Sequence, residues 1–104
     1  MPNSYSLNEY QKKINLWIKD YGGYWPPLSM LAAIIEEIGE VAREINNLEG
    51  YKPLKSEEQV DIGGELADLL FSLLCLANHY KIDLDKKLVE TLLKYTNRDG
   101  NRFL

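Results

Sequence analysis

The chain has 104 residues, which is the size of one domain with a single hydrophobic core. Hydrophobic residues make up 45% and charged residues 27%, a balance typical of a folded chain and not of a disordered one. The formal net charge of −4 argues against a nucleic-acid-binding protein, which would carry a basic surface stripe. We therefore expect one folded domain over residues 1–104, with no nucleic-acid partner.

Cysteine usage and hydropathy indicate the compartment. Cys75 is the sole cysteine, so no internal disulfide can form and a reducing environment is favoured. The N-terminal stretch MPNSYSLNEYQKK lacks the apolar core of a signal peptide. No apolar run approaches the roughly 18 residues of a membrane span. These features predict a cytoplasmic protein without a membrane partner.

The spacing of apolar residues predicts two helices in the first half of the chain. Ser6 and Glu9 form a capping box at the start of the first helix, and the pair Gly22–Gly23 should end it. Pro27 suits the first position of the second helix, because its missing N–H would have no partner there. Apolar residues continue at helical spacing as far as Leu48.

Two more helices are expected in the second half. Ser56 and Gln59 form a second candidate capping box, so a third helix is predicted over residues 56–80, with first turns that Gly63–Gly64 makes irregular. Its second half is apolar on nearly every side, which predicts burial on most sides. Asp83 should cap a fourth helix that ends at Gly100. The residues expected on its buried face are Leu84, Leu88, Leu92 and Tyr95. The chain as a whole is predicted to be an all-α helical bundle of about four helices.

Acidic pairs mark the second and third helices. Glu37 and Glu40 stand three residues apart, as do Glu65 and Asp68. Carboxylates at this spacing have Cβ atoms about 5–6 Å apart and share one helix face, where like charges are destabilising. The acids of the second helix alone would fit a solvated face near Arg43. In the second pair, Asp68 lies in the apolar segment LADLLF and Glu65 directly precedes it, and no cation stands on their strip, so we expect a metal ion there.

The ligand set indicates the metal and the reaction. Ligands that are all oxygen select hard cations, here Mg²⁺, with Mn²⁺ as the alternative. A di-iron bundle would use Glu-x-x-His ligands, and no histidine follows these acids at that spacing. Magnesium held by carboxylates usually completes its coordination with water and substrate phosphates. Hydrolysis of a phosphoanhydride is therefore the leading reaction class.

At these residues the chain resembles the MazG-like family of all-α nucleoside triphosphate pyrophosphohydrolases. The family motif EExxE…ExxD stands here as EEIGE at residues 36–40 and ELAD at residues 65–68. The similarity extends over residues 25–98 and includes the basic segment KYTNR at residues 94–98. The resemblance implies cleavage between the α- and β-phosphates of a nucleoside triphosphate. It also implies a homodimer or homotetramer, and it suggests a role in removing non-canonical nucleotides.

The resemblance also implies roles for individual residues. The metal ligands would be Glu37, Glu40, Glu65 and Asp68. Glu36 would be a supporting acid that positions water. Lys94, Asn97 and Arg98 match the phosphate- and sugar-side residues of the family.

Two interpretations are open for Trp25 and for the basic residues of the fourth helix, and one is favoured for each of the other aromatic and reactive residues. Trp25, in a loop, would either stack on a base or anchor the core or an interface. Lys94 and Arg98 would either bind phosphate or complement the dipole of the fourth helix. Trp17 is expected in the core, while His79 and Cys75 are expected to be structural.

Two alternative functions remain open from the sequence. Related folds hydrolyse phosphoribosyl-ATP, and a direct comparison of substrates would separate that activity from triphosphate hydrolysis. The chain would otherwise be a helical dimerisation or binding module whose acids only bind cations. Stabilisation by a metal without release of pyrophosphate would favour the module.

Overall fold

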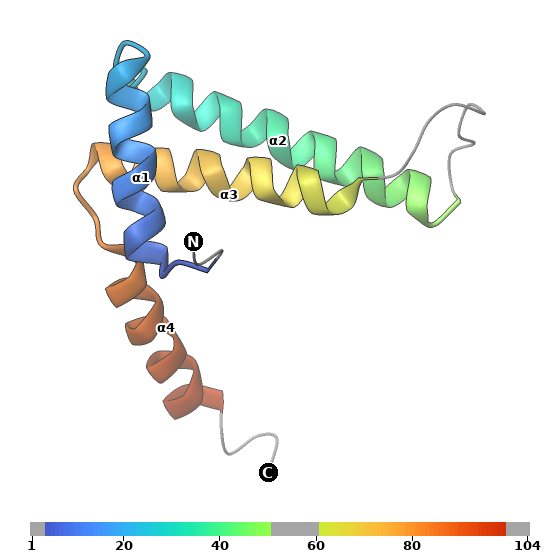
Figure 1. Cartoon of the computed structure of the whole chain (residues 1–104). Coiled ribbons are helices and arrows are strands. Elements are labelled where there is room, and N and C mark those ends of the chain that lie inside the picture. The colour runs from blue at the N-terminus through green and yellow to red at the C-terminus, as the bar shows by residue number, and fades with distance from the viewer. Residues whose placement is uncertain (1–3, 51–60, 100–104) are drawn as a thin grey trace.

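The computed structural model describes residues 4–50 and 61–99 of the chain. The candidate capping box of Ser56 and Gln59, and the candidate stop at Gly100, lie outside these residues. The described part contains only helices, which confirms the predicted all-α class with four helices (Figure 1). No helix in it is long and apolar enough to cross a membrane. The helices are α1 (Leu7–Asp20), α2 (Pro27–Leu48), α3 (Ile62–His79) and α4 (Leu84–Asp99).

Both ends of α1 form as the sequence predicts. The Ser6 hydroxyl accepts a hydrogen bond from the Glu9 N–H at 3.1 Å, and the Glu9 carboxylate accepts one from the Ser6 N–H at 3.2 Å. Beyond the helix, Gly22 and Gly23 have φ values of 103° and 91°, a region that L side chains rarely adopt. This turn leads into the loop that carries Trp25 towards the N-terminus of α2.

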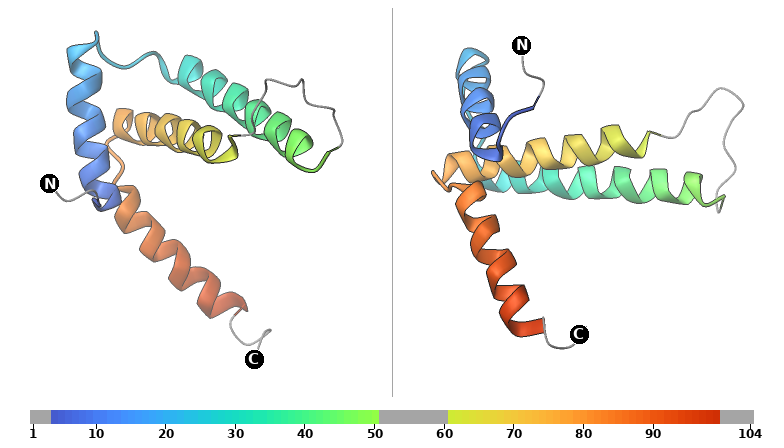
Figure 2. Two further views of the ribbon diagram at one scale, coloured as in Figure 1. Left: turned by 45° about the vertical axis from the view of Figure 1, so that its right-hand side comes forward. Right: turned by 60° about the horizontal axis from the view of Figure 1, so that its bottom comes forward.

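Helices α2 and α3 run antiparallel and side by side, and they form the main body of the molecule (Figures 1 and 2). Pro27 occupies the first turn of α2, as predicted. The buried apolar side chains lie on these two helices and mostly near the end where α1 crosses α3. They are Met30, Ile34, Leu74, Cys75 and Ala77.

The start of α3 differs from the prediction. Asp61 has φ −130° and ψ 69°, so a helix that runs continuously over residues 56–80 is wrong at this position. Its carboxylate instead accepts a hydrogen bond from the Gly64 N–H at 2.9 Å and caps a helix that begins at residue 62. A Cβ atom at Gly64 would overlap the Asp61 carboxylate, so the glycine allows the close approach. The Asp61 N–H donates to Glu44 of α2 at 3.2 Å.

Helix α4 leaves the body of the molecule. Its cap is confirmed, because Asp83 Oδ1 accepts a hydrogen bond from the Lys86 N–H at 3.1 Å. The helix packs mainly on α1 at its own N-terminal end and then projects away from α2 and α3 (Figure 2). No described residue of α4 is buried, and Leu92 is 61% exposed. Leu84 is half-buried, whereas Leu88, Leu92 and Tyr95 are exposed, so the predicted buried face of α4 is wrong for a single chain beyond its first turn.

The chain leaves much apolar surface uncovered. Its Cα radius of gyration is 17.1 Å, whereas a compact chain of this length has about 13 Å. The prediction that the third helix is buried on most sides is also wrong for one chain, because α2 and α1 cover only part of it. The exposed apolar residues of α3 include Leu66, Leu70, Phe71 and Leu73. Large exposed apolar patches of this kind mark interaction surfaces.

Candidate functional site

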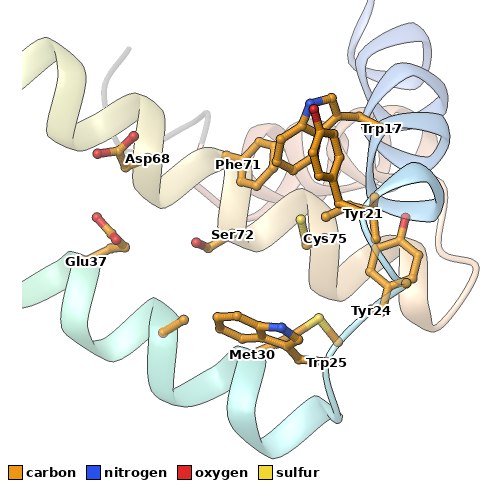
Figure 3. Close-up of a pocket in the computed structure, with 13 residues that line it drawn as sticks. Trp17, Tyr21, Tyr24, Trp25, Met30, Glu37, Asp68, Phe71, Ser72 and Cys75 are labelled. Carbon is orange, nitrogen blue, oxygen red and sulfur yellow. The ribbon is translucent and has the colours of Figure 1, made fainter.

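Three carboxylates converge where α2 faces α3. One carboxylate oxygen each from Glu37, Glu65 and Asp68 lies within 4.8 Å of the other two. Glu37 and Glu65 are half-buried and Asp68 is exposed. The antiparallel pairing of the two helices creates the cluster, because it brings the acidic strip of α3 over that of α2 (Figure 3).

The other acids of α2 do not join this cluster. Glu40, one turn after Glu37, lies 3.5 Å from the Arg43 guanidinium in an exposed ion pair. Glu44 accepts a hydrogen bond from the N–H of Asp61. Glu36 is exposed on α2 and lies outside the group of three carboxylates.

The surroundings of Glu65 shift the pKa of its carboxyl. Partial burial and the neighbouring charges, led by that of Asp68, raise the pKa of the Glu65 carboxyl above its ordinary value. The charges of Glu40, Glu37 and Glu44 act in the same direction. Glu65 stands in the first turn of α3, where the helix dipole favours an anion. A bound cation would relieve the remaining repulsion.

The three carboxylates fit a small, hard cation. Oxygen ligands of Mg²⁺ stand about 2.0–2.1 Å from the ion, so two of them are at most about 4.2 Å apart. The separations of up to 4.8 Å require only a small movement of side chains. The donor set contains oxygen alone, as Mg²⁺ and Mn²⁺ prefer.

A cavity of about 440 Å³ adjoins the cluster. Glu37 and Asp68 lie at one end of it, and aromatic side chains surround the other end (Figure 3). These rings come from α1, from the loop after it and from α3. They are Trp17, Tyr21, Tyr24, Trp25 and Phe71.

The cavity is lined by two tryptophans, for which the sequence predicts different positions. Trp25 lines the cavity and is 64% exposed, which places it within reach of a ligand there. Trp17 was expected in the core and is 51% exposed, so that prediction is wrong. Its ring packs edge-to-face on Phe71, with ring centroids 5.9 Å apart, and its centroid lies 4.6 Å from that of the Tyr21 ring. Trp17 therefore forms part of a cavity wall.

Sequence reasoning did not single out most of this aromatic wall. Trp17 and Tyr21 are four residues apart, so they share one face of α1. That spacing was assigned to the core, although it also suits the wall of a ligand cavity. Phe71 follows Asp68 by three residues, which brings a ring beside the acid on α3.

Cys75 and His79 take no part in the acidic cluster. Cys75 is buried and lines the cavity, and burial raises the pKa of its thiol, so it remains protonated. His79 is exposed and packs edge-to-face on Tyr80, with ring centroids 4.9 Å apart. Both observations agree with the structural roles that the sequence predicts.

The basic segment of α4 lies apart from the acids within one chain. The Lys94 ammonium and the Arg98 guanidinium lie 5.1 and 4.6 Å from the centroid of the Tyr95 ring. Arg98 also forms an ion pair with Asp99 at 2.7 Å. Asn97 is exposed on the same helix. Because α4 projects away from α2 and α3, the chain alone does not bring these side chains to the cluster (Figure 1).

Comparison with known protein families gives a match over most of the chain. The MazG nucleotide pyrophosphohydrolase domain matches residues 26–103, most of the chain. The chain belongs to the MazG family. The matched range includes both acidic pairs and the whole of α4. The resemblance seen in the sequence is thus confirmed, and the protein is a hydrolase that acts on nucleotides.

Individual relatives support the same assignment. The uncharacterised protein YpjD of Bacillus subtilis is 36% identical over 100 residues, which cover 94% of this chain and 90% of YpjD. The crystal structure of YpjD, named as a candidate pyrophosphatase, has a TM-score of 0.80 at 35% identity and covers 90% of this chain and 98% of its own. A Bacillus-conserved MazG protein, named as a nucleotide pyrophosphohydrolase, has a TM-score of 0.78 at 33% identity. That match covers 96% of this chain and 99% of the other.

Proposed function

We propose that this member of the MazG family hydrolyses a nucleoside triphosphate to the monophosphate and pyrophosphate, with Mg²⁺ at the acidic cluster. The observation that supports this most directly is the convergence of Glu37, Glu65 and Asp68 beside a cavity lined with aromatic rings. A metal-binding end and an aromatic end match the two ends of a nucleotide. Non-canonical nucleotides are the substrates we expect.

The carboxylates of the cluster hold the ion. Glu37, Glu65 and Asp68 are already close enough, and Glu40 is the fourth ligand in this proposal. The ion pair of Glu40 with Arg43 is exposed on both sides, so it is weak and a metal can displace it. When bound, Mg²⁺ would neutralise phosphate charge and lower the pKa of an attacking water, and Mn²⁺ is the alternative. Glu36, the exposed residue before Glu37 on α2, is assigned to orient that water.

The aromatic end of the cavity is assigned to the base. Trp25 exposes 64% of its surface and presents a ring with few protein neighbours, which suits stacking on a base. Stacking on an aromatic ring tolerates any base, because every base has a π face. This end of the cavity therefore accommodates a range of bases.

A second copy of the chain completes the assembly in this proposal. Apolar residues on α3 and α4 are left uncovered by the single chain, and Leu88 and Leu92 form an exposed stripe on α4. Surface of this extent destabilises a chain of 104 residues unless another surface covers it. We assign it to a homodimer or homotetramer. Lys94, Asn97 and Arg98 would then serve the phosphate and sugar side of a site on a neighbouring copy.

The test is release of pyrophosphate across a panel of canonical and modified triphosphates, with and without Mg²⁺, beside the Glu40→Gln variant. We expect release that requires Mg²⁺ and is lost in a folded Glu40→Gln protein. Activity retained by that folded variant would contradict the assignment of Glu40 as a ligand. A folded wild-type protein that releases pyrophosphate from no triphosphate would contradict the proposed reaction. Phosphoribosyl-ATP hydrolysis, or a binding module, would then be tested.

A further inference from the structure

Ser72 occupies the middle of the cavity. It lies one helical turn after Asp68 on α3, so the two side chains share a face. In Figure 3 its hydroxyl stands between the acidic pair and the aromatic rings and faces the space between α3 and α2. Ser72 is half-buried, so its hydroxyl is partly shielded from bulk water.

The hydroxyl of Ser72 has no protein partner among the described residues. Serine and threonine inside a helix often donate to the carbonyl four residues earlier. Thr91 of α4 does so, with its Oγ1 donating to the Lys87 carbonyl at 2.8 Å. Ser72 makes no such bond in the part of the chain that the structure describes. Its donor and acceptor are therefore available to a ligand in the cavity.

The neighbouring hydroxyls of the cavity are less suited to this role. The Tyr24 hydroxyl already donates to Asn15 Oδ1 at 2.7 Å. Tyr21 is 73% exposed and stands at the rim. Ser72 thus carries the free hydroxyl nearest to the middle of the cavity, close to Glu37 and Asp68 (Figure 3).

We propose that Ser72 hydrogen-bonds a hydroxyl of the nucleotide sugar and so determines how the enzyme discriminates between sugars. This inference rests on the proposed function, in which the acids bind the phosphate end and the rings bind the base. In a nucleotide the sugar lies between these two ends. Along the cavity, Ser72 lies between the acids and the rings. The order of groups in the ligand therefore matches the order of side chains in the site.

The test compares Ser72→Ala with the wild type on ribo-, 2′-deoxyribo-, 3′-deoxyribo- and 2′,3′-dideoxyribonucleoside triphosphates of one base. Alanine removes the hydroxyl and preserves the helix, because it has the highest helix propensity. Ser29→Ala removes an exposed serine of α2 that does not line the cavity, and serves as the matched control. Binding of the α,β-imido analogues of the same nucleotides, measured by calorimetry, gives a readout that does not require turnover.

We expect Ser72→Ala to lower kcat/KM and affinity by about 3- to 10-fold for sugars that carry the recognised hydroxyl. The dideoxy nucleotide should bind and react equally well with both proteins. Comparison of the two monodeoxy sugars then identifies the hydroxyl, and Ser29→Ala should show none of these changes.

An equal loss for all four sugars, or no loss, would overturn the role of Ser72 while leaving the proposed function intact. Analogue binding that depends on the sugar and on Ser72, in a wild type without turnover, would support the sugar contact and contradict the reaction. Absence of both turnover and analogue binding would overturn both proposals.

Discussion

Gln11 of α1 and Asn78 of α3 exchange two hydrogen bonds. Gln11 Nε2 donates to Asn78 Oδ1 at 2.9 Å, and Asn78 Nδ2 donates to the main-chain oxygen of Gln11 at 2.9 Å. The Gln11 amide also donates to the Ile82 carbonyl at 2.8 Å and accepts from the Leu84 N–H at 3.0 Å. One buried side chain therefore connects α1, the end of α3 and the start of α4.

Replacement of Gln11 by leucine should destabilise the fold. Leucine has a similar volume but leaves Asn78 Oδ1, the Ile82 carbonyl and the Leu84 N–H without the Gln11 side chain as partner. We expect the free energy of unfolding to fall by about 2–4 kcal/mol, measured by urea denaturation at fixed protein concentration. The neighbouring exposed change Lys12→Ala should alter it by less than about 0.5 kcal/mol. Equal stability of the two variants would show that the network contributes little.

The Asp68→Asn variant should separate metal binding from folding. Asparagine preserves the shape of the side chain and removes one negative charge from the cluster with Glu37 and Glu65. Without metal, the variant should therefore be at least as stable as the wild type, whereas stabilisation by Mg²⁺ should be lost. We expect kcat/KM to fall by at least about 100-fold. Glu90→Gln, on α4, makes the same change of charge away from the cluster and is the control.

Loss of metal-free stability in Asp68→Asn would contradict this prediction, because it would show that Asp68 supports the fold itself. Thermal unfolding with and without Mg²⁺ measures both quantities in one experiment. The control Glu90→Gln should keep its full stabilisation by Mg²⁺.

The raised pKa of Glu65 should make metal binding and stability depend on pH. Because the folded pKa lies above the unfolded pKa, the native metal-free chain binds more protons than the unfolded chain between these values. The contribution of Glu65 to the free energy of unfolding is therefore fully present below the unfolded pKa, and it is lost as the pH rises through the folded pKa. Mg²⁺ requires the carboxylate, so its affinity should decrease as pH falls through the same range.

Calorimetric titration with Mg²⁺ at neutral and mildly acidic pH measures this linkage. The wild type should take up the metal with release of protons, most strongly where Glu65 titrates. Glu65→Gln removes that group, so any remaining proton release must come from the other acids. Identical proton release from both proteins would show that Glu65 does not exchange a proton for the metal.

The exposed stripe of α4 should be needed for association. Leu92→Glu places a charge on a side chain that is 61% exposed in the single chain, where it costs little by itself. At an interface the same charge would be desolvated and strongly unfavourable. We expect analytical ultracentrifugation to show a smaller species for Leu92→Glu than for the wild type. Thr91→Glu, the adjacent position on the helix, tests whether charge alone has this effect.

Local signals were sufficient to predict where helices begin. The Ser6–Glu9 capping box, Pro27 at the start of α2 and Asp83 before α4 all act through neighbouring residues, and the structure contains each of them. Asp61 was not recognised as a cap, because the sequence pattern continues upstream towards Ser56. The distinction depends on a backbone conformation at one residue, which periodicity does not report.

Burial could not be predicted in the same way. The apolar spacing of Leu88 and Leu92 predicts a buried face, but it does not tell whether the covering surface would belong to the same chain. The approach of Glu37 to Asp68 could be predicted from the sequence, because each helix carries its own acidic spacing. The aromatic wall could not be predicted, since the rings of Trp17 and Phe71 meet only where α1 crosses α3.

The cap of α3 has a consequence for how this sequence can vary. The Asp61 carboxylate lies in the space that a Cβ atom at Gly64 would need. The overlapping atoms are at the end of the Asp61 side chain, so the carboxylate can turn aside when residue 64 is larger than glycine. Glu9 stands three residues after the cap Ser6 in α1, which shows that a cap is compatible with a side chain at that position. Homologues that keep Asp61 are therefore expected to tolerate alanine at residue 64, with the capping carboxylate in a shifted position.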